Sequence, residues 1–237
     1  MIRNYKLILT TLFLTTVLFG ASENFQGNVT VDDKLAFSLT GRYTEKNGLA
    51  TKTTNYFTSS GKRIISEKVR YKDSSFDLID YTSHDSRTGR REEIVRKDNN
   101  YVVRFQSNSN KKIEEKIFPG ERNILHASNV AMFFLKNIDT ILRQNQITFK
   151  LLVPERMMVV DFQIEHTGSK IINGKDCNEF KMEPTLLVLK PLVKPIFLYY
   201  EKQAPYKIHT YIGPILPRNN NGRQSVGIID FKYQSPS

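Results

Sequence analysis

Apolar and polar residues alternate along most of this chain in short runs, and residues typical of turns separate the runs. Lys46-Asn47-Gly48 and Arg87-Thr88-Gly89 are two such separators. Runs of this kind at close spacing predict a meandering antiparallel sheet, and the charged residues within them indicate one solvated face. In the first part of the chain we predict strands over 34–43, 51–57, 62–71, 76–81, 91–96, 101–106 and 112–118.

One segment departs from the two-residue period. Between Ala127 and Asn145 the apolar residues recur at helical spacing, and Ser128 is a candidate N-cap. We interpret this segment as a helix packed on the sheet; the alternative is an amphipathic lid that opens towards lipid. Strands then resume over 147–153, 156–165, 169–172, 176–183, 194–201, 206–212 and 226–234. The predicted fold is therefore mainly β (β-rich α+β), a curved antiparallel sheet or half-barrel packed on one principal helix at about 128–144.

Residues 1–22 are typical of a secretory signal peptide. Arg3 and Lys6 precede an apolar run from Leu7 to Phe19, and small residues follow it. The run is shorter than the roughly 20 residues that a membrane span needs. We expect cleavage near Ser22, and no Cys at that boundary indicates a lipid anchor. The prediction is an exported, periplasmic protein with a single β-rich domain over 23–237.

The charge of the chain favours anionic partners. The formal net charge is +11, and loss of Arg3 and Lys6 with the signal peptide leaves +9. The cations occur as scattered pairs, such as Arg90-Arg91, rather than among stacking aromatics on a nucleic-acid-binding motif. We therefore expect an anionic envelope surface as a partner and no nucleic acid.

Residues with catalytic or metal-binding potential are few and scattered. The four histidines fall in no HxH or HExxH pattern, and the chain has no G-x-S-x-G elbow and no phosphate-binding glycine loop. Cys177, the single cysteine, lies in a predicted strand and is expected to be buried. We predict no catalytic residues, no metal, no cofactor and no enzymatic activity. The histidines are His84, His126, His166 and His209.

The stretch from Leu186 to Tyr200 is rich in apolar residues and carries only Lys190 and Lys194 as charges. Apolar residues on both faces of a strand indicate burial on both faces. Two interpretations are open: a strand covered by the helix, or the wall of an apolar cavity for a lipid-like ligand. The predicted lining of such a cavity is Phe134, Ile138, Phe197, Tyr199 and Tyr211.

Several segments also resemble a known family. They are NYFTSSGKRI at 55–64, the D-x-R-T-G turn at 85–89, VAMFFLKNID at 130–139, IINGKDCNEFKMEPT at 171–185 and VKPIFLYYEKQAPYKIHTYIG at 193–213. With the order of elements, they resemble uncharacterised exported bacterial envelope proteins related to the LolA/LolB-like half-barrel. The resemblance implies an incomplete barrel wrapped on a helix in the periplasm; LolA and LolB carry acyl chains in an apolar cavity. We predict only one helix after the signal peptide, fewer than LolA has, which counts against a lipoprotein-chaperone role.

Three functions follow as hypotheses. The leading one is a non-enzymatic periplasmic protein that binds a lipid-like or other apolar ligand in a half-barrel cavity. The second is a structural or partner-binding component of the envelope without such a cavity. The third, which the residues favour least, is a hydrolase with an unrecognised site.

Overall fold

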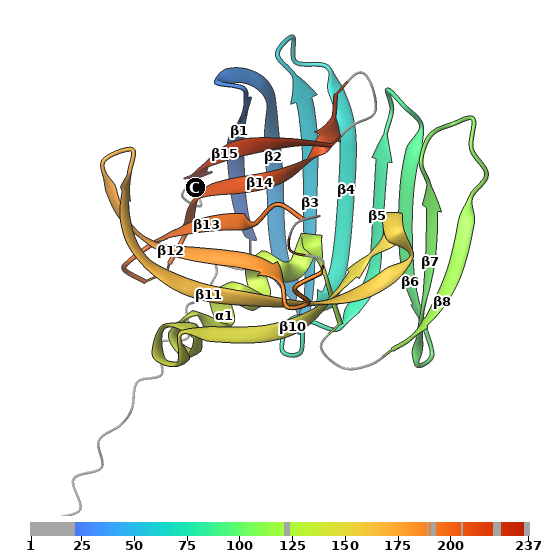
Figure 1. Ribbon diagram of the computed structural model, residues 1–237. Coiled ribbons are helices and arrows are strands. Elements are labelled where there is room, and N and C mark those ends of the chain that lie inside the picture. Colours follow the sequence, from blue (N-terminus) through green and yellow to red (C-terminus); the bar gives the residue numbers. More distant parts are fainter. Residues whose placement is uncertain are drawn as a thin grey trace, which may run out of the picture.

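In the computed structural model, the described residues are 22–120, 124–188, 190, 193–204, 206–219 and 224–234. The predicted signal peptide therefore lies outside the described residues except for Ser22, which begins the first strand. The predicted β class is confirmed, since the described residues form one open, curved sheet of fifteen strands with one α-helix (Figure 1). In this part of the chain no helix has the length and apolar character needed to cross a membrane.

The first arm of the sheet is an antiparallel meander in which each strand pairs with the next. Tight turns connect its strands; Asn47 and Gly48, between the second and third strands, both adopt positive φ, as a two-residue hairpin turn requires. The strands are β1 (Ser22–Val31), β2 (Lys34–Lys46), β3 (Leu49–Thr58), β4 (Arg63–Lys72), β5 (Leu78–Asp85), β6 (Arg90–Lys97), β7 (Asn100–Gln106) and β8 (Glu114–Pro119).

The second arm contains the remaining strands and joins the first arm through pairing of β1 with the last strand. The sheet order is β8 to β1, then β15 down to β9, so β8 and β9 are its two ends. The short β9 pairs parallel to β10, whereas the other pairs are antiparallel. The strands are β9 (Ile124–His126), β10 (Gln146–Val153), β11 (Met158–Ile172), β12 (Lys175–Pro184), β13 (Ile196–Glu201), β14 (Ile208–Arg218) and β15 (Gln224–Gln234).

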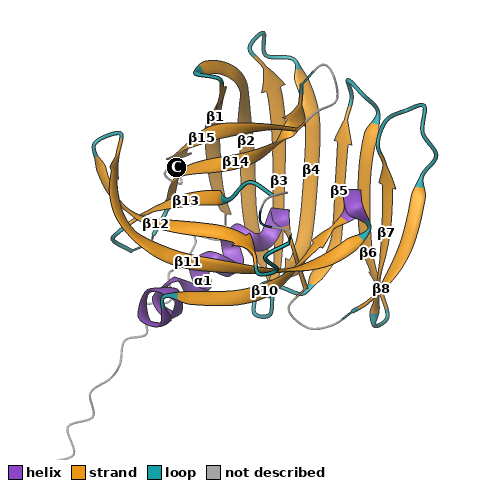
Figure 2. Cartoon of the chain, in the orientation of Figure 1, coloured by secondary structure: helices purple, strands orange, loops and turns teal. Residues whose placement is uncertain are grey.

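The two arms curve towards each other around the helix. Strands β10–β15 run across the first arm at a steep angle, and α1 (Ala127–Gln144) lies between the arms (Figure 2). A short 3₁₀ helix, η1 (Pro154–Arg156), connects β10 and β11. We call the face of the sheet turned towards α1 the concave face and the opposite face the convex face.

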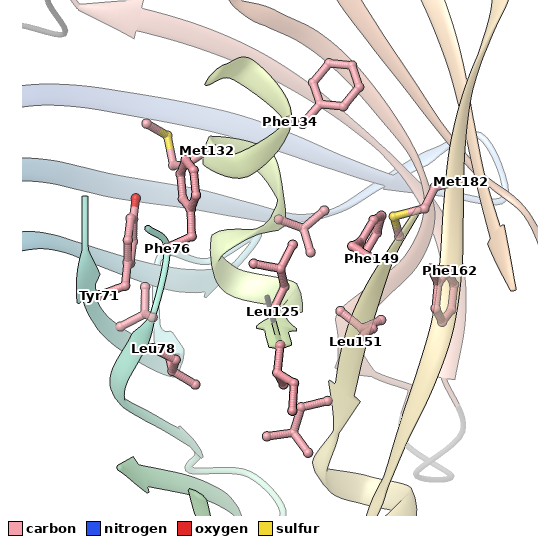
Figure 3. Packing of buried hydrophobic residues seen from close by; sticks show 14 of the residues in the cluster. Tyr71, Phe76, Leu78, Leu125, Met132, Phe134, Phe149, Leu151, Phe162 and Met182 are labelled. Atoms are coloured by element: carbon pink, nitrogen blue, oxygen red, sulfur yellow. The ribbon is translucent and has the colours of Figure 1, made fainter. Parts of the chain in front are cut away.

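The main hydrophobic core lies between α1 and both arms. Phe134 of α1 is fully buried, with its ring centroid 4.4 Å from that of Tyr200 and 4.6 Å from that of Phe180. Tyr71 and Phe76 of the first arm belong to the same cluster as residues of the second arm (Figure 3). Burial of one such aromatic side chain contributes roughly 1.5–3 kcal/mol, so contacts across α1 hold the arms together.

Two local expectations differ from the structure. The N-cap of α1 is His126 rather than Ser128; Nδ1 of His126 accepts from the Ser128 N–H at 3.3 Å, and the His126 N–H donates to Oδ1 of Asn129 at 2.9 Å. The strand β1 was not predicted, because Gly27 interrupts its apolar alternation between Phe25 and Val29.

Within the stretch from Leu186 to Tyr200, burial on both faces is found in the strand, where Leu198, Tyr199 and Tyr200 are 5%, 2% and 0% exposed. The strand in this stretch begins only at Ile196. Leu186, Leu187 and Val188 are exposed, because β12 ends at Pro184 and the chain leaves the sheet there. Cys177, in contrast, is buried as predicted.

Candidate functional site

A row of polar side chains crosses the concave face of the first arm. Thr54 of β3 lies opposite Glu67 of β4, Glu67 opposite Ser83 of β5, and Ser83 opposite Glu92 of β6. Lys52 lies two residues before Thr54, on the same face of β3. We call these five side chains the polar belt; they are Lys52, Thr54, Glu67, Ser83 and Glu92.

Apolar residues flank the polar belt on both sides along the same strands. On the side of α1, Val69, Tyr81 and Ile94 belong to the main core. On the other side, Leu39, Tyr56 and Ile65 belong to a second, smaller core cluster. Along β4 the concave residues thus read Ile65, Glu67, Val69, with one carboxylate between two buried aliphatic side chains.

Lys52 and Glu67 are the charged pair at the centre of the belt. Nζ of Lys52 donates to the backbone oxygen of Ser128 at 3.0 Å, and the Tyr81 hydroxyl donates to Oε1 of Glu67 at 2.7 Å. Burial lowers the pKa of Lys52 and raises that of Glu67, while their mutual attraction opposes both shifts. Both side chains nevertheless remain partly exposed, so solvent reaches this part of the concave face.

His126 lies where the belt meets the main core. Its ring centroid is 4.0 Å from that of Tyr81, the phenol that donates to Glu67. Burial first, and then the nearby positive charge of Lys52, lower the pKa of His126 to about 3. The ring is therefore neutral near pH 7, which allows Nδ1 to accept the hydrogen bond that caps α1.

An ionic network at one end of the belt links the two arms. Arg90 of β6 pairs with Glu92 and lies 3.4 Å from Oε2 of Glu155 in η1. Arg218, at the end of β14, pairs with the same carboxylate of Glu155. The Arg90 guanidinium also lies 4.8 Å from the ring centroid of Phe105. The network fixes β14 of the second arm relative to the belt in the first.

The structure does not bring the five predicted cavity residues to one place. Phe134 and Ile138 are buried in the main core, with exposed fractions of 0% and 2%. Phe197 and Tyr199 lie on the convex face of β13, since they alternate with the core residues Leu198 and Tyr200. Nζ of Lys170 lies 5.7 Å from the Tyr199 ring centroid on that face.

Tyr211 is the one predicted residue close to the polar belt. It lies on the concave face of β14, opposite Leu198, and packs with the smaller core cluster that contains Tyr56. Burial raises the pKa of Tyr56, and the nearby Glu67 and Tyr211 raise it further, so the three groups share one neighbourhood. The Tyr211 hydroxyl donates to the backbone oxygen of Pro214 at 2.7 Å.

Sequence reasoning missed the charged members of the belt, although a signal for them was present. Glu67 occupies the apolar phase of β4, and Lys52 occupies the phase of Ala50 and Tyr56 in β3. A charged side chain at an apolar position of an alternating strand lowers the stability of the fold unless an oppositely charged or hydrogen-bonding group lies beside it. Among the described residues, no group of three or more His, Cys, Asp or Glu side chains is placed to hold a metal ion.

Two grooves lie over the convex face, and the lining of the larger includes the belt residues Ser83 and Glu92. The larger has a volume of about 470 Å³ over β4–β7, and its lining includes His84, Arg91 and Arg104. The smaller, of about 230 Å³, lies over β15 and β1–β3 and is lined by Phe25, Gly41, Arg42 and uncharged polar side chains. Arg104 is already paired with Glu93 and Glu115, which leaves the larger groove mixed in charge.

Comparison with known proteins informs the fold. No protein-family model matches the sequence, and no curated protein matches it. A β-barrel-like protein of the domain of unknown function DUF1849 from Brucella abortus has a TM-score of 0.53 at 7% identity, over 91% of this chain and 99% of that chain.

Two further solved structures match at lower TM-scores. A DUF1329 family protein from Desulfovibrio piger matches at a TM-score of 0.21 with 12% identity, over 89% of this chain and 82% of that chain. A porin-like protein from Bacteroides uniformis matches at 0.27 with 8% identity, over 89% and 97%. These two scores are too low to carry an argument. The expected β half-barrel is supported by the Brucella structure, and the chain is therefore similar in fold, and in fold alone, to a β-barrel-like protein of unknown function.

Proposed function

We propose that this chain is a non-enzymatic binding protein of the bacterial envelope that holds an amphiphilic ligand at the polar belt. The observation that carries the proposal is the partly exposed pair Lys52 and Glu67 between two apolar clusters. Binding sites for small molecules combine mostly apolar walls with a few polar groups that orient the ligand. The resemblance to LolA/LolB-like half-barrels and the signal-like residues 1–22 support a periplasmic place of action.

The charges of the belt define the kind of headgroup that fits. Lys52 can donate to an anionic oxygen, and Glu67 can pair with an ammonium group. A zwitterionic headgroup carries both groups, and the partly buried hydrophobic side chains around the smaller core cluster, among them Phe37, Tyr211 and Leu216, offer apolar surface to an acyl chain. The proposed ligand is therefore a zwitterionic, single-chain or double-chain amphiphile.

The first test is mass spectrometry under native conditions of the protein purified without detergent, before and after addition of lysophosphatidylethanolamine. We expect a bound amphiphile in the purified protein or stoichiometric uptake of the added one. Lys52→Met and Glu67→Gln should each weaken uptake by about tenfold to a hundredfold, because each removes a hydrogen bond to a charged group.

Matched controls lie on the convex face of the same sheet. Lys68→Met and Glu93→Gln make the same chemical changes one position away from Glu67 and Glu92, and we expect them to leave uptake unchanged. Circular dichroism of all four variants checks that each is folded. The proposal fails if no amphiphile binds, or if folded Lys52→Met takes up as much lysophosphatidylethanolamine as Lys68→Met.

A partner-binding component of the envelope is the second candidate, and the end strand β8 favours it. In the described sheet β8 pairs with β7 on one side only, and its Ile117 is 59% exposed. An unpaired strand edge can accept a strand from another protein. Crosslinking from Ile117→Cys to one stoichiometric envelope protein, without amphiphile uptake, would favour this candidate.

A further inference from the structure

Three consecutive aliphatic side chains shortly after the end of β12 are exposed. Leu186, Leu187 and Val188 are 54%, 79% and 74% exposed, and we call them the apolar tip. Isolated exposed apolar residues are common on soluble proteins, whereas contiguous ones mark a contact surface. The apolar tip lies outside both core clusters, so packing within the described chain does not explain it.

Specific contacts hold the base of the apolar tip. The Thr185 N–H donates to the backbone oxygen of Asp161 in β11 at 2.9 Å, immediately before the tip. After it, the Lys190 N–H donates to the Leu187 oxygen at 3.3 Å, and Nζ of Lys190 lies 2.6 Å from Oε1 of Glu183. The tip is thus a turn fastened to β11 and β12 on both sides.

Cations outnumber anions beside the apolar tip. Lys181 and Lys190 both pair with Glu183, and their hydrogen bonds lower the pKa of Glu183. Lys194 is exposed on the other side of the turn. With Asp161 at the base of the tip, these three lysines and two carboxylates leave one net positive charge. This excess suits an anionic surface.

We propose that the apolar tip inserts into the interfacial layer of an anionic lipid bilayer, with Lys190 and Lys194 at the level of the headgroups. Aliphatic side chains bordered by lysines are the chemistry with which peripheral proteins bind membranes. A short turn with exposed aliphatic side chains can enter between headgroups, whereas a protein partner would need a broader complementary surface. The inference does not rest on the ligand site at the polar belt.

The test is cosedimentation of the full mature chain with vesicles of phosphatidylethanolamine and phosphatidylglycerol, and with vesicles of phosphatidylcholine alone. We expect binding to the anionic vesicles and weaker binding to the neutral ones. The triple variant Leu186→Ser, Leu187→Ser, Val188→Ser should lower the partition coefficient on anionic vesicles at least about tenfold, because it removes the apolar surface that enters the membrane. Lys194→Gln should lower it less.

Ile171→Ser is the matched control. Ile171 is 74% exposed and also neighbours a lysine, but it lies near the turn between β11 and β12, at the opposite end of β12 from the apolar tip. We expect this variant to bind vesicles as the parent does. The proposal is overturned if the parent does not sediment with anionic vesicles, or if Ile171→Ser lowers binding as much as the triple variant.

Sedimentation velocity without lipid tests the remaining alternative, in which the apolar tip contacts a second copy of the chain. If the triple variant converts a dimer into a monomer and leaves vesicle binding unchanged, the apolar tip contacts a second copy of the chain and the proposal is wrong. If the parent and the triple variant have the same oligomeric state and differ only in vesicle binding, the proposal is supported.

Discussion

The polar belt and the main hydrophobic core occupy the same face of the same strands, one step of the two-residue period apart. On β4 the step from Val69 to Glu67 leads from a residue that is 1% exposed, in the main core, to a partly exposed carboxylate. The backbone geometry is the same at both positions. What differs is the cover: Phe134 and its neighbours on α1 pack over the core, while solvent reaches Lys52 and Glu67.

This difference shows what the helix contributes. Side chains beneath α1 are excluded from water and are apolar. The charged side chains of the belt are retained because they have partners: Lys52 donates to the Ser128 oxygen at the start of α1, and Glu92 pairs with Arg90. The concave face is therefore divided into a packed part that supplies stability and an accessible part that can bind a ligand. Substitutions in the packed part should therefore lower the free energy of unfolding more than substitutions in the belt, where charge and pH determine the effect.

The largest effect is expected in the packed part. Phe134→Ala removes a fully buried ring between Phe180 and Tyr200 and should lower the free energy of unfolding by about 3–5 kcal/mol. Phe197→Ala is the matched change at a half-buried position on the convex face, and it should lower the free energy of unfolding by clearly less. Urea denaturation of both variants measures the difference; equal losses would show that α1 does not set the packed part apart.

A smaller effect is expected at the charged pair. Lys52→Met or Glu67→Gln alone leaves the other group without its opposite charge. Each should lower the free energy of unfolding by about 1–3 kcal/mol. The double variant should cost less than the sum of the two single changes, by about 0.5–3 kcal/mol. A thermodynamic cycle from urea denaturation gives this coupling, and strict additivity would show that the two charges do not interact.

The smallest effect on stability at neutral pH is expected at His126, which lies where the polar belt meets the main core. The pKa of His126 is about 3 in the folded chain against 6.5 for the ordinary group, so the unfolded chain binds the proton first as the pH falls. Stability therefore decreases from about pH 6.5 downwards until about pH 3, by at most about 1.4 kcal/mol per pH unit from this one group.

The variant His126→Asn keeps an N-cap side chain but does not titrate. Denaturation at several pH values should show a shallower loss of stability on acidification for the variant than for the parent. Parallel curves for the two proteins would contradict a buried, neutral His126, because carboxylates titrate in both and cannot account for a difference between them.

Local chemistry was sufficient to predict most of the elements. The period-two runs and turn residues such as Asn47-Gly48, which the structure places at positive φ between β2 and β3, determine where strands begin and end. The helical spacing of Val130, Phe134 and Ile138 determines α1 in the same way. These features depend on neighbours within a few residues, so they can be recognised in the sequence.

The candidate site depended on contacts that the sequence does not reveal. The apolar stretch 186–200 contains both the buried strand residues Leu198 to Tyr200 and the exposed Leu186–Val188, and the sequence does not separate the two because burial depends on what else packs there. Phe197 and Tyr199 fell on the convex face because the register of β12 with β13 turns Leu198 and Tyr200 towards the core. A change of register by one residue would have reversed both faces.

The sequence by itself determined a β-rich chain of short strands around one amphipathic helix, and its apolar periods placed Phe134 and Ile138 on the buried side of that helix. Only the tertiary structure decided that β1 pairs with β15, that α1 packs over the core and contacts the polar belt at Lys52, and that Lys52 and Glu67 lie on one face. The physical reason is range. Strand and helix formation follow from nearby residues, whereas the surroundings of a side chain are set by segments that lie far apart along the chain and are adjacent only after folding.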